Sequence, residues 1–209
     1  MAAIAGGLDV FYPIVPDVAW LERLVPLGVR TIQLRLKDAA PERLRREIGQ
    51  SIEICRRLRC QLIVNDHWRE ALALGADYVH LGQEDLAGAD VAALQGKGVR
   101  LGISTHSEEE LAVALAASPD YVALGPIYET RLKVMQWAPQ GLDRIGDWKA
   151  RIGALPLVAI GGITPERANG VMAAGAGSVA VITDFLTHAD PQARVRQWLA
   201  WAERVRRSV

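Results

Sequence analysis

The sequence has few cysteines, few aromatic residues and no net charge. It contains two cysteines, Cys55 and Cys60, and aromatic residues make up 6% of the chain. Two thiols cannot build a disulfide framework or a four-ligand zinc site by themselves, so we expect both to be reduced. Lysine and arginine, 24 in all, balance 24 aspartates and glutamates, which leaves no overall field to attract nucleic acid or an anionic membrane.

Long hydrophobic runs are also missing, although half of the residues are hydrophobic. No run reaches the ~18 uncharged residues of a membrane span, and Met1 to Val15 lacks the basic start of a signal peptide. We therefore expect a cytoplasmic protein without a membrane partner. A chain of this length buries roughly 70% of its unfolded surface, and no linker-like stretch divides it, so one domain over residues 1–209 is predicted.

Short apolar segments recur along the chain, and each is followed by a longer segment with helical spacing of apolar residues. The predicted strands are Phe11–Val15, Thr31–Leu36, Gln61–Asn65, Tyr78–Gly82, Arg100–Thr105, Tyr121–Gly125, Leu157–Gly162 and Ser178–Thr183. The clearest predicted helices cover 41–58, 107–117, 164–174, where Thr164 caps the helix, and 191–205. Eight such units predict an α/β fold, a (β/α)8 TIM barrel. A doubly wound open sheet is the alternative, but no glycine-rich nucleotide-binding pattern follows the first strand.

Alternation along these strands predicts which side chains point into the barrel. In the second strand Gln33, Arg35 and Lys37 are expected inside or at the rim, and His80 is expected inside the fourth. The next three strands are expected to present small residues inside, namely Gly102 and Ser104, Ala123 and Gly125, and Ala159 and Gly161. Polar and small side chains together predict a cavity at the top of the barrel. Small residues that merely fit a narrow barrel are the alternative.

Two carboxylates follow neighbouring predicted strands, Asp66 after the third and Asp85 after the fourth. Neighbouring strands lie ~4.8 Å apart, so the two side chains can share one hard cation. One or two carboxylates with substrate phosphates are the usual arrangement around magnesium, and Arg35 with Lys37 would complete a diphosphate clamp. The alternative interpretation is that each aspartate only caps a helix or stabilises a turn.

A second anion site is predicted where the seventh strand leads into a helix through Gly161 and Gly162. Backbone N–H groups at such a turn can approach an oxyanion, and Ile182-Thr183 after the eighth strand would form the other wall.

The longest irregular stretch, 126–141, is typical of an active-site lid, and its Lys133 could neutralise a departing diphosphate. The alternative for Lys133 is a solvated surface lysine.

Seven motifs in register resemble the thiamine phosphate synthase family across nearly the whole chain. They are Gln33-Leu34-Arg35-Leu36-Lys37, Asn65-Asp66, His80-Leu81-Gly82-Gln83-Glu84-Asp85, Gly102-Ile103-Ser104-Thr105-His106, Ala123-Leu124-Gly125-Pro126, Ala138-Pro139-Gln140-Gly141 and Ala159-Ile160-Gly161-Gly162-Ile163. The resemblance implies a barrel enzyme that joins 4-amino-5-hydroxymethyl-2-methylpyrimidine diphosphate to a thiazole phosphate, giving thiamine phosphate and diphosphate.

The resemblance also implies a role for each matching residue. Magnesium would be held by Asp66 and Asp85. The pyrimidine diphosphate would be held by Gln33, Leu34, Arg35, Leu36, Lys37, Asn65, Ser104 and Lys133, among which Arg35, Lys37 and Lys133 would be catalytic. The thiazole phosphate would be held by Thr130, Gly162, Ile182 and Thr183. The lid reads Thr130-Arg131-Leu132-Lys133, where the family commonly has a hydroxyl at the third position, so Leu132 could offer only its backbone N–H.

Other functions remain as alternatives at this stage. A related thiazole tautomerase resembles this barrel but needs no diphosphate clamp, and a non-catalytic phosphate-binding barrel would share the fold. Arginines in 43–59 are interleaved with glutamates, which favours a solvated helix face over an RNA-binding surface. The outer helices would also be compatible with a homodimer.

Overall fold

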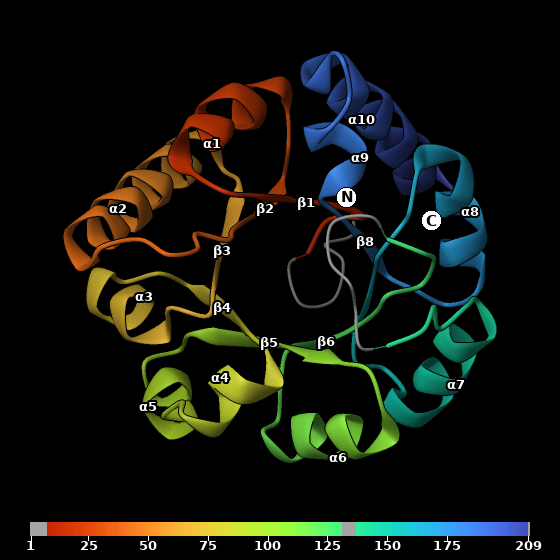
Figure 1. Cartoon of the computed structure of the whole chain (residues 1–209), viewed down its shortest axis with the longest axis horizontal. Coiled ribbons are helices and arrows are strands. Elements are labelled where there is room, and N and C mark those ends of the chain that lie inside the picture. Colours follow the sequence, from red (N-terminus) through yellow and green to blue (C-terminus); the bar gives the residue numbers. More distant parts are fainter. Residues whose placement is uncertain (1–7, 131–136, 209) are drawn as a thin grey trace.

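The computed structural model describes residues 8–130 and 137–208. Eight parallel strands form a closed barrel in chain order, with β8 paired back to β1 (Figure 1). The strands are β1 (Phe11–Val15), β2 (Thr31–Leu34), β3 (Gln61–Asn65), β4 (Tyr78–Leu81), β5 (Arg100–Thr105), β6 (Tyr121–Leu124), β7 (Leu157–Ile160) and β8 (Ser178–Val181). The predicted TIM barrel is confirmed, and the open-sheet alternative is wrong.

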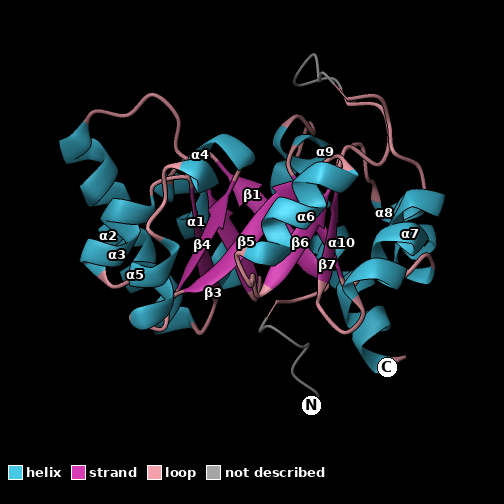
Figure 2. Cartoon of the chain, turned by 90° about the horizontal axis from the view of Figure 1, so that it is seen from below, coloured by secondary structure: helices cyan, strands magenta, loops and turns pink. Residues whose placement is uncertain are grey.

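Helices surround the barrel on the outside (Figure 1). They are α1 (Val18–Leu24), η1 (Val25–Leu27), α2 (Pro41–Leu58), α3 (Trp68–Leu74), α4 (Gln83–Ala87), α5 (Val91–Gly96), α6 (Glu108–Ala116), α7 (Asp143–Ile152), α8 (Pro165–Ala173), α9 (Thr183–Leu186) and α10 (Pro191–Arg207). Figure 2 shows α4 and α9 at one end of the barrel and the last turn of α10 at the other. Within the described ranges, no helix combines the length and the apolar character needed to cross a membrane.

Five predicted strands end one or two residues too late. The difference occurs in β2, β4, β6, β7 and β8. After β7 the chain turns at Gly161 and Gly162, whose φ angles are +104° and +64°, and after β8 the next helix already begins at Thr183. Motif residues at the strand ends therefore lie in loops at the carboxyl end of the barrel, where barrel enzymes bind their ligands.

Local sequence explains where several helices begin. The side chains of Asp17, Ser107 and Asp190 accept hydrogen bonds from the backbone N–H three residues later, as N-cap residues do. Thr164 is the N-cap residue of α8, as predicted, but its side chain makes no capping hydrogen bond. Pro165 follows at the first helical position, where a missing N–H costs nothing.

Buried residues form two layers, one between the strands and the helices and one inside the barrel. The inner layer contains Tyr12, Tyr78 and Tyr121, all at most 1% exposed. In β7 the inner residues are Val158 and Ile160, so the prediction of Ala159 and Gly161 inside is wrong. Val158 pairs with the inward-facing Ala123 of β6, and Ala159 belongs to the outer layer. A small apolar residue fits either layer, so size alone misled the assignment.

Candidate active site

The predicted carboxylate pair comes together at the carboxyl end of the barrel. Asp66 follows β3, and its backbone N–H donates to the carbonyl of His80 in β4 at 2.9 Å. Asp85 reaches the same place from the short helix α4, and the two carboxylates line the same pocket. Burial raises the pKa of Asp66, the neighbouring Asp85 raises it further, and Arg35 and His67 oppose this effect. Two neighbouring carboxylates repel each other when both are charged, and a bound cation would relieve this repulsion.

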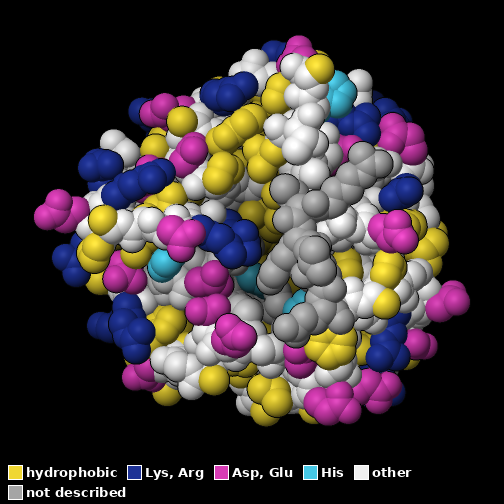
Figure 3. Space-filling view, viewed as in Figure 1, with side chains coloured by type: hydrophobic (Ala, Val, Ile, Leu, Met, Phe, Trp, Pro, Cys, Tyr) yellow, Lys and Arg dark blue, Asp and Glu magenta, His cyan; other side chains and the backbone are white. Residues whose placement is uncertain are grey.

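Cationic residues of the β2 loop lie beside this pair. Arg35 begins that loop, and its charge influences both Asp66 and His80. Lys37 lines a pocket of about 520 Å³ together with both aspartates. Figure 3 shows basic, acidic and histidine side chains next to one another on the β2–β4 side of the barrel mouth. The remaining lining residues are Leu36, Asp38, His67, Trp68, Arg69, Glu70, Glu84 and Gly88.

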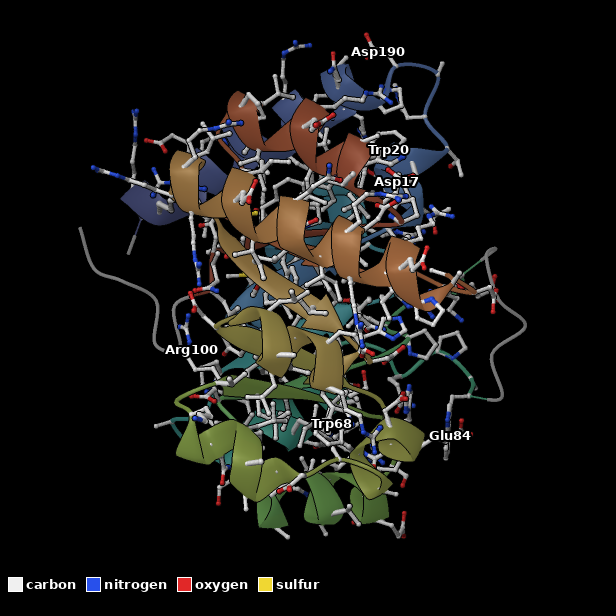
Figure 4. All side chains as sticks on the ribbon, turned by 90° about the vertical axis from the view of Figure 1, so that its left-hand side faces the viewer. Asp17, Trp20, Trp68, Glu84, Arg100 and Asp190 are labelled. Atoms are coloured by element: carbon white, nitrogen blue, oxygen red, sulfur yellow. The ribbon has the colours of Figure 1, made fainter. Side chains whose placement is uncertain are left out.

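The pocket differs in position from the predicted cavity. It lies over the loops after β2, β3 and β4, and none of the small inward residues of β5 to β7 lines it. Tyr121 fills the space that Gly102 leaves, because a Cβ at Gly102 would lie 2.1 Å from the tyrosine ring. Figure 4 shows Glu84, a rim residue of the pocket, and Arg100 at opposite ends of the barrel.

His67 joins the two loops that carry the charges. Its Nε2 lies 2.9 Å from the carbonyl oxygen of Leu36. Leu36 is itself buried, and Leu34 packs in the outer layer, so of these two side chains only Leu36 lines the pocket. The hydrogen bond fixes the loop that holds Arg35 and Lys37 against the turn that holds Asp66.

Five side chains inside the barrel form a continuous chain of hydrogen bonds. The amide of Gln33 donates to the hydroxyl of Tyr12 at 2.6 Å, and this hydroxyl lies 3.0 Å from that of Tyr121. The Tyr121 hydroxyl lies 2.7 Å from Nδ1 of His80, whose Nε2 lies 2.8 Å from Oγ of Ser104. Burial and the charge of Arg35 lower the pKa of His80 to about 4, so its imidazole is neutral at pH 7. The predicted inward positions of Gln33, His80 and Ser104 are thus confirmed.

Asn65 lies between the carboxylate pair and the barrel interior. It is the last residue of β3, is 6% exposed and pairs with His80 across the sheet. It directly precedes Asp66 in the chain, so its amide lies beside the carboxylate pair. Nothing in the packing conflicts with its predicted contact to the substrate.

The predicted second anion site lies over β7 and β8. Ile160 pairs with Ala180, so the loops that carry Gly162 and Ile182-Thr183 leave adjacent strands. Ile182 packs against the inner layer, and Thr183 starts α9. Gly162 packs tightly on the segment before Thr130, because a Cβ there would lie 2.5 Å from the carbonyl oxygen of Glu129.

Three lid residues that carry predictions lie outside the described residues, namely Arg131, Leu132 and Lys133. After this gap the ring of Trp137 stacks on that of His106, with 5.7 Å between ring centroids and 6° between planes.

Cys55 and Cys60 are buried free thiols, as expected.

Sequence reasoning missed His67, Tyr12 and Tyr121. Alternation could have identified Tyr121, because it lies two residues before the inward Ala123. The same alternation places Tyr12 inside β1, two residues before Ile14. His67 had no such signal, since its partner is a backbone carbonyl in another loop.

Comparisons with known proteins identify relatives over most of the chain. Residues 11–185 match the family model described as thiamine monophosphate synthase. A thiamine-phosphate synthase of Rhizobium etli is 57% identical over 92% of this chain and 95% of its own length. The chain belongs to the thiamine monophosphate synthase family. A thiamine-phosphate synthase of Salmonella dublin is 48% identical over 90% of this chain and 89% of its own length.

Solved structures show the same barrel. A thiamine phosphate pyrophosphorylase from Pyrococcus furiosus superimposes with a TM-score of 0.81 at 26% identity, over 93% of this chain and 96% of that one. A 3-hexulose-6-phosphate synthase, at 16% identity and a TM-score of 0.65, shares the fold alone. Membership of the thiamine monophosphate synthase family makes the protein a transferase of thiamine biosynthesis.

Proposed function

We propose that this thiamine-phosphate synthase works with magnesium on two small substrates. It joins 4-amino-5-hydroxymethyl-2-methylpyrimidine diphosphate to 4-methyl-5-(2-phosphoethyl)thiazole, and it releases diphosphate and thiamine phosphate. The observation that carries this proposal is that Asp66 and Asp85 line one pocket together with Lys37, beside the charge of Arg35.

The donor set fits magnesium. Two carboxylates from neighbouring loops offer the oxygen ligands that magnesium prefers, and the ion usually completes its shell with water and substrate phosphate. Asp66 and Asp85 would hold it. Bound there, magnesium supplies positive charge to the leaving diphosphate.

Cationic residues of the chain would contact the diphosphate on the side that magnesium does not. Arg35 and Lys37 present cations next to the carboxylate pair, and an arginine fork matches phosphate oxygens well. Lys133 would approach from the lid and neutralise the departing charge. Gln33, Asn65 and Ser104 lie deeper, towards the barrel interior, and would orient the pyrimidine.

The thiazole phosphate would bind over β7 and β8. The backbone at Gly162, Ile182 and Thr183 faces this region from adjacent loops, and Thr130 lies at the end of the segment that packs on Gly162. Backbone N–H groups at the start of a helix favour an anion. This arrangement would aim the thiazole nitrogen towards the carbon that loses diphosphate.

The reaction then needs positioning and charge stabilisation rather than a covalent intermediate on the enzyme. The exocyclic carbon of an electron-rich aminopyrimidine can ionise when its diphosphate leaves, and the thiazole nitrogen captures the cation. The cationic side chains Arg35, Lys37 and Lys133 stabilise the charge that grows on the leaving group. The new C–N bond replaces the C–O bond, and both electrons of the C–O bond leave with the diphosphate.

Replacing Asp66 with asparagine tests the proposal. Asp66 has a φ of +62°, a conformation that asparagine tolerates and alanine does not, so Asp66→Asn removes charge without adding backbone strain. We expect turnover to fall about 100-fold and the magnesium dependence to shift to higher concentration, because one hard ligand is lost. Thiamine phosphate and diphosphate are measured while magnesium is varied.

Asp77→Asn is the matched control. Asp77 is an exposed carboxylate at the opposite end of the barrel, where it pairs with Arg56, and its loss should leave turnover unchanged. Wild-type turnover in Asp66→Asn, or full activity after magnesium is chelated, contradicts the proposal. A tautomerase would convert its thiazole substrate without releasing diphosphate, so the same assay excludes or supports that alternative.

A further inference from the structure

The interior hydrogen-bond chain has a direction. The Gln33 amide donates to Tyr12, so the single hydroxyl hydrogen of Tyr12 is left for Tyr121. For both buried hydroxyls to use their single hydrogen, Tyr121 must accept from Tyr12 and donate to Nδ1 of His80, which lies 2.7 Å away. Each hydroxyl thus accepts from one neighbour and donates to the next.

The direction continues through the imidazole. A neutral histidine carries one ring hydrogen, and an Nδ1 that accepts leaves this hydrogen on Nε2. His80 Nε2 therefore donates to Oγ of Ser104 at 2.8 Å. The hydroxyl hydrogen of Ser104 is then directed away from His80.

We infer that Tyr121 is a positioning residue, which fixes the tautomer of His80 and so turns the hydroxyl hydrogen of Ser104 towards the substrate, while Tyr12 supports it through the hydrogen bond to its hydroxyl. This inference rests on the proposed function, in which Ser104 contacts the pyrimidine. A ring nitrogen of an aminopyrimidine accepts a hydrogen bond, and a Ser104 that always donates would hold the ring in one orientation. Gln33 at the other end of the chain is also assigned to the pyrimidine, so one network sets both contacts.

Burial strengthens the hydrogen bonds that join the tyrosines to His80. Tyr12 is 1% exposed, Tyr121 is fully buried, and His80 is 7% exposed. The ring of Tyr121 stacks on His80 with 5.5 Å between centroids and 15° between planes, and the ring of Tyr12 meets Tyr121 edge-on at 6.3 Å. A phenylalanine at either position keeps these ring contacts and removes only the hydroxyl. Polar groups buried in this way interact strongly because the surroundings screen them little.

Nitrogen-15 NMR of the free enzyme tests the tautomer directly. The His80 signals, assigned by comparison with His80→Gln, should show a protonated Nε2 and an unprotonated Nδ1 at pH 7. In Tyr121→Phe the donor to Nδ1 is gone, so we expect a measurable Nδ1–H population. In Tyr12→Phe the Tyr121 hydroxyl still donates, and the wild-type tautomer should persist.

Kinetics test what the tautomer does. We expect Tyr121→Phe to lower kcat about tenfold and to raise KM for the pyrimidine diphosphate, while KM for the thiazole phosphate stays within twofold. Tyr12→Phe should have a smaller effect on kcat. A purely structural role predicts equal effects, because both tyrosines are buried to the same degree.

Thr105→Val is the matched control. Thr105 follows Ser104 but faces the outer layer, where its buried hydroxyl donates to the carbonyl of Ala123 and accepts from Trp148. This variant also loses a buried hydroxyl, yet it should keep the wild-type tautomer and kcat. A change in either would mean that loss of buried hydrogen bonds, rather than the tautomer, controls turnover, and this would overturn the inference.

The NMR and kinetic measurements together distinguish a failure of this inference from a failure of the proposed function. An Nδ1–H tautomer in the wild type, or an unchanged tautomer and unchanged kcat in Tyr121→Phe, overturns the inference even if thiamine phosphate is formed. The tautomer in the wild-type protein decides the matter even where Tyr121→Phe does not fold. Absence of product with the expected tautomers would contradict the proposed function alone.

Discussion

At the residue scale, the glycines after β7 are required by packing as much as by a ligand. Gly161 and Gly162 both have positive φ, and a Cβ at either would lie within 2.7 Å of the segment after β6. From the sequence, these glycines are predicted to form an anion site because their backbone N–H groups could approach a phosphate. The structure adds that they let two loops pack together, so the same residues would shape the wall of the proposed thiazole site.

Gly162→Ala should therefore affect one substrate more than the other. The new methyl group meets the carbonyl oxygen of Glu129 and Cβ of Tyr128, and the φ of +64° adds strain. We expect the free energy of unfolding to fall by about 1–3 kcal/mol and KM for the thiazole phosphate to rise about tenfold. Urea unfolding and steady-state kinetics measure both. An equal rise in KM for the pyrimidine diphosphate would contradict the assignment of this loop.

At the element scale, Arg194 of α10 ties together the helices that follow β7 and β8. It donates twice to Asp184 of α9, at 2.8 Å each, and it lies 3.4 Å from Glu166 of α8. Trp198 Nε1 donates to the same Asp184 carboxylate at 2.7 Å. Hydrogen bonds from the Thr164 hydroxyl, from the backbone N–H of Glu166 and from Arg194 lower the pKa of Glu166 to about 2, so this carboxylate is charged at pH 7.

Arg194→Met should loosen α9 and the Thr183 turn that begins it. We expect the free energy of unfolding to fall by about 2 kcal/mol, because a half-buried carboxylate loses a bidentate partner. KM for the thiazole phosphate should rise as well. Arg207→Met is the control, since its pair with Glu203 is exposed and should contribute little. Similar losses in the two variants, measured by urea unfolding, would contradict this account.

The same elements show what could be predicted from sequence. Each strand started where predicted, because alternation and flanking turn residues mark a strand locally. Asp66 and Asp85 could be paired because parallel neighbouring strands bring their carboxyl ends together. The inward face of β7 could not be predicted, since Val158 and Ala159 suit either layer and only the register with Ala123 decides. The contact between His67 and the Leu36 carbonyl depends on loop conformation, which no pattern encodes.

At the scale of the whole molecule, the candidate active site and the contacts that join the first and last strands lie at opposite ends of the barrel. Asp9, just before β1, is 6% exposed, and Arg206 near the end of α10 donates to both of its carboxylate oxygens. The backbone of Asp9 also accepts from Ser178 of β8 and donates to Thr31 of β2. One residue thus connects the first, second and last strands at the end remote from the pocket.

Arg206→Leu should weaken the barrel without changing its chemistry. Removal of one partner leaves the buried Asp9 carboxylate unpaired, so we expect a loss of about 3 kcal/mol in the free energy of unfolding. Both KM values and kcat at 25 °C should stay within twofold of wild type, because the amino end of a barrel serves stability rather than ligand binding. A selective kinetic defect in a variant of normal stability would contradict this division.

The three tyrosines that fill the inside of the barrel also determine how ligands can travel. Tyr12, Tyr78 and Tyr121 fill the interior of the barrel between the described strands, so under the proposed function both substrates would enter from its carboxyl end. The pyrimidine, proposed to contact Gln33 and Ser104, would then bind deeper than the thiazole phosphate over β7 and β8. We therefore expect ordered binding with the pyrimidine diphosphate first, which product-inhibition kinetics would check.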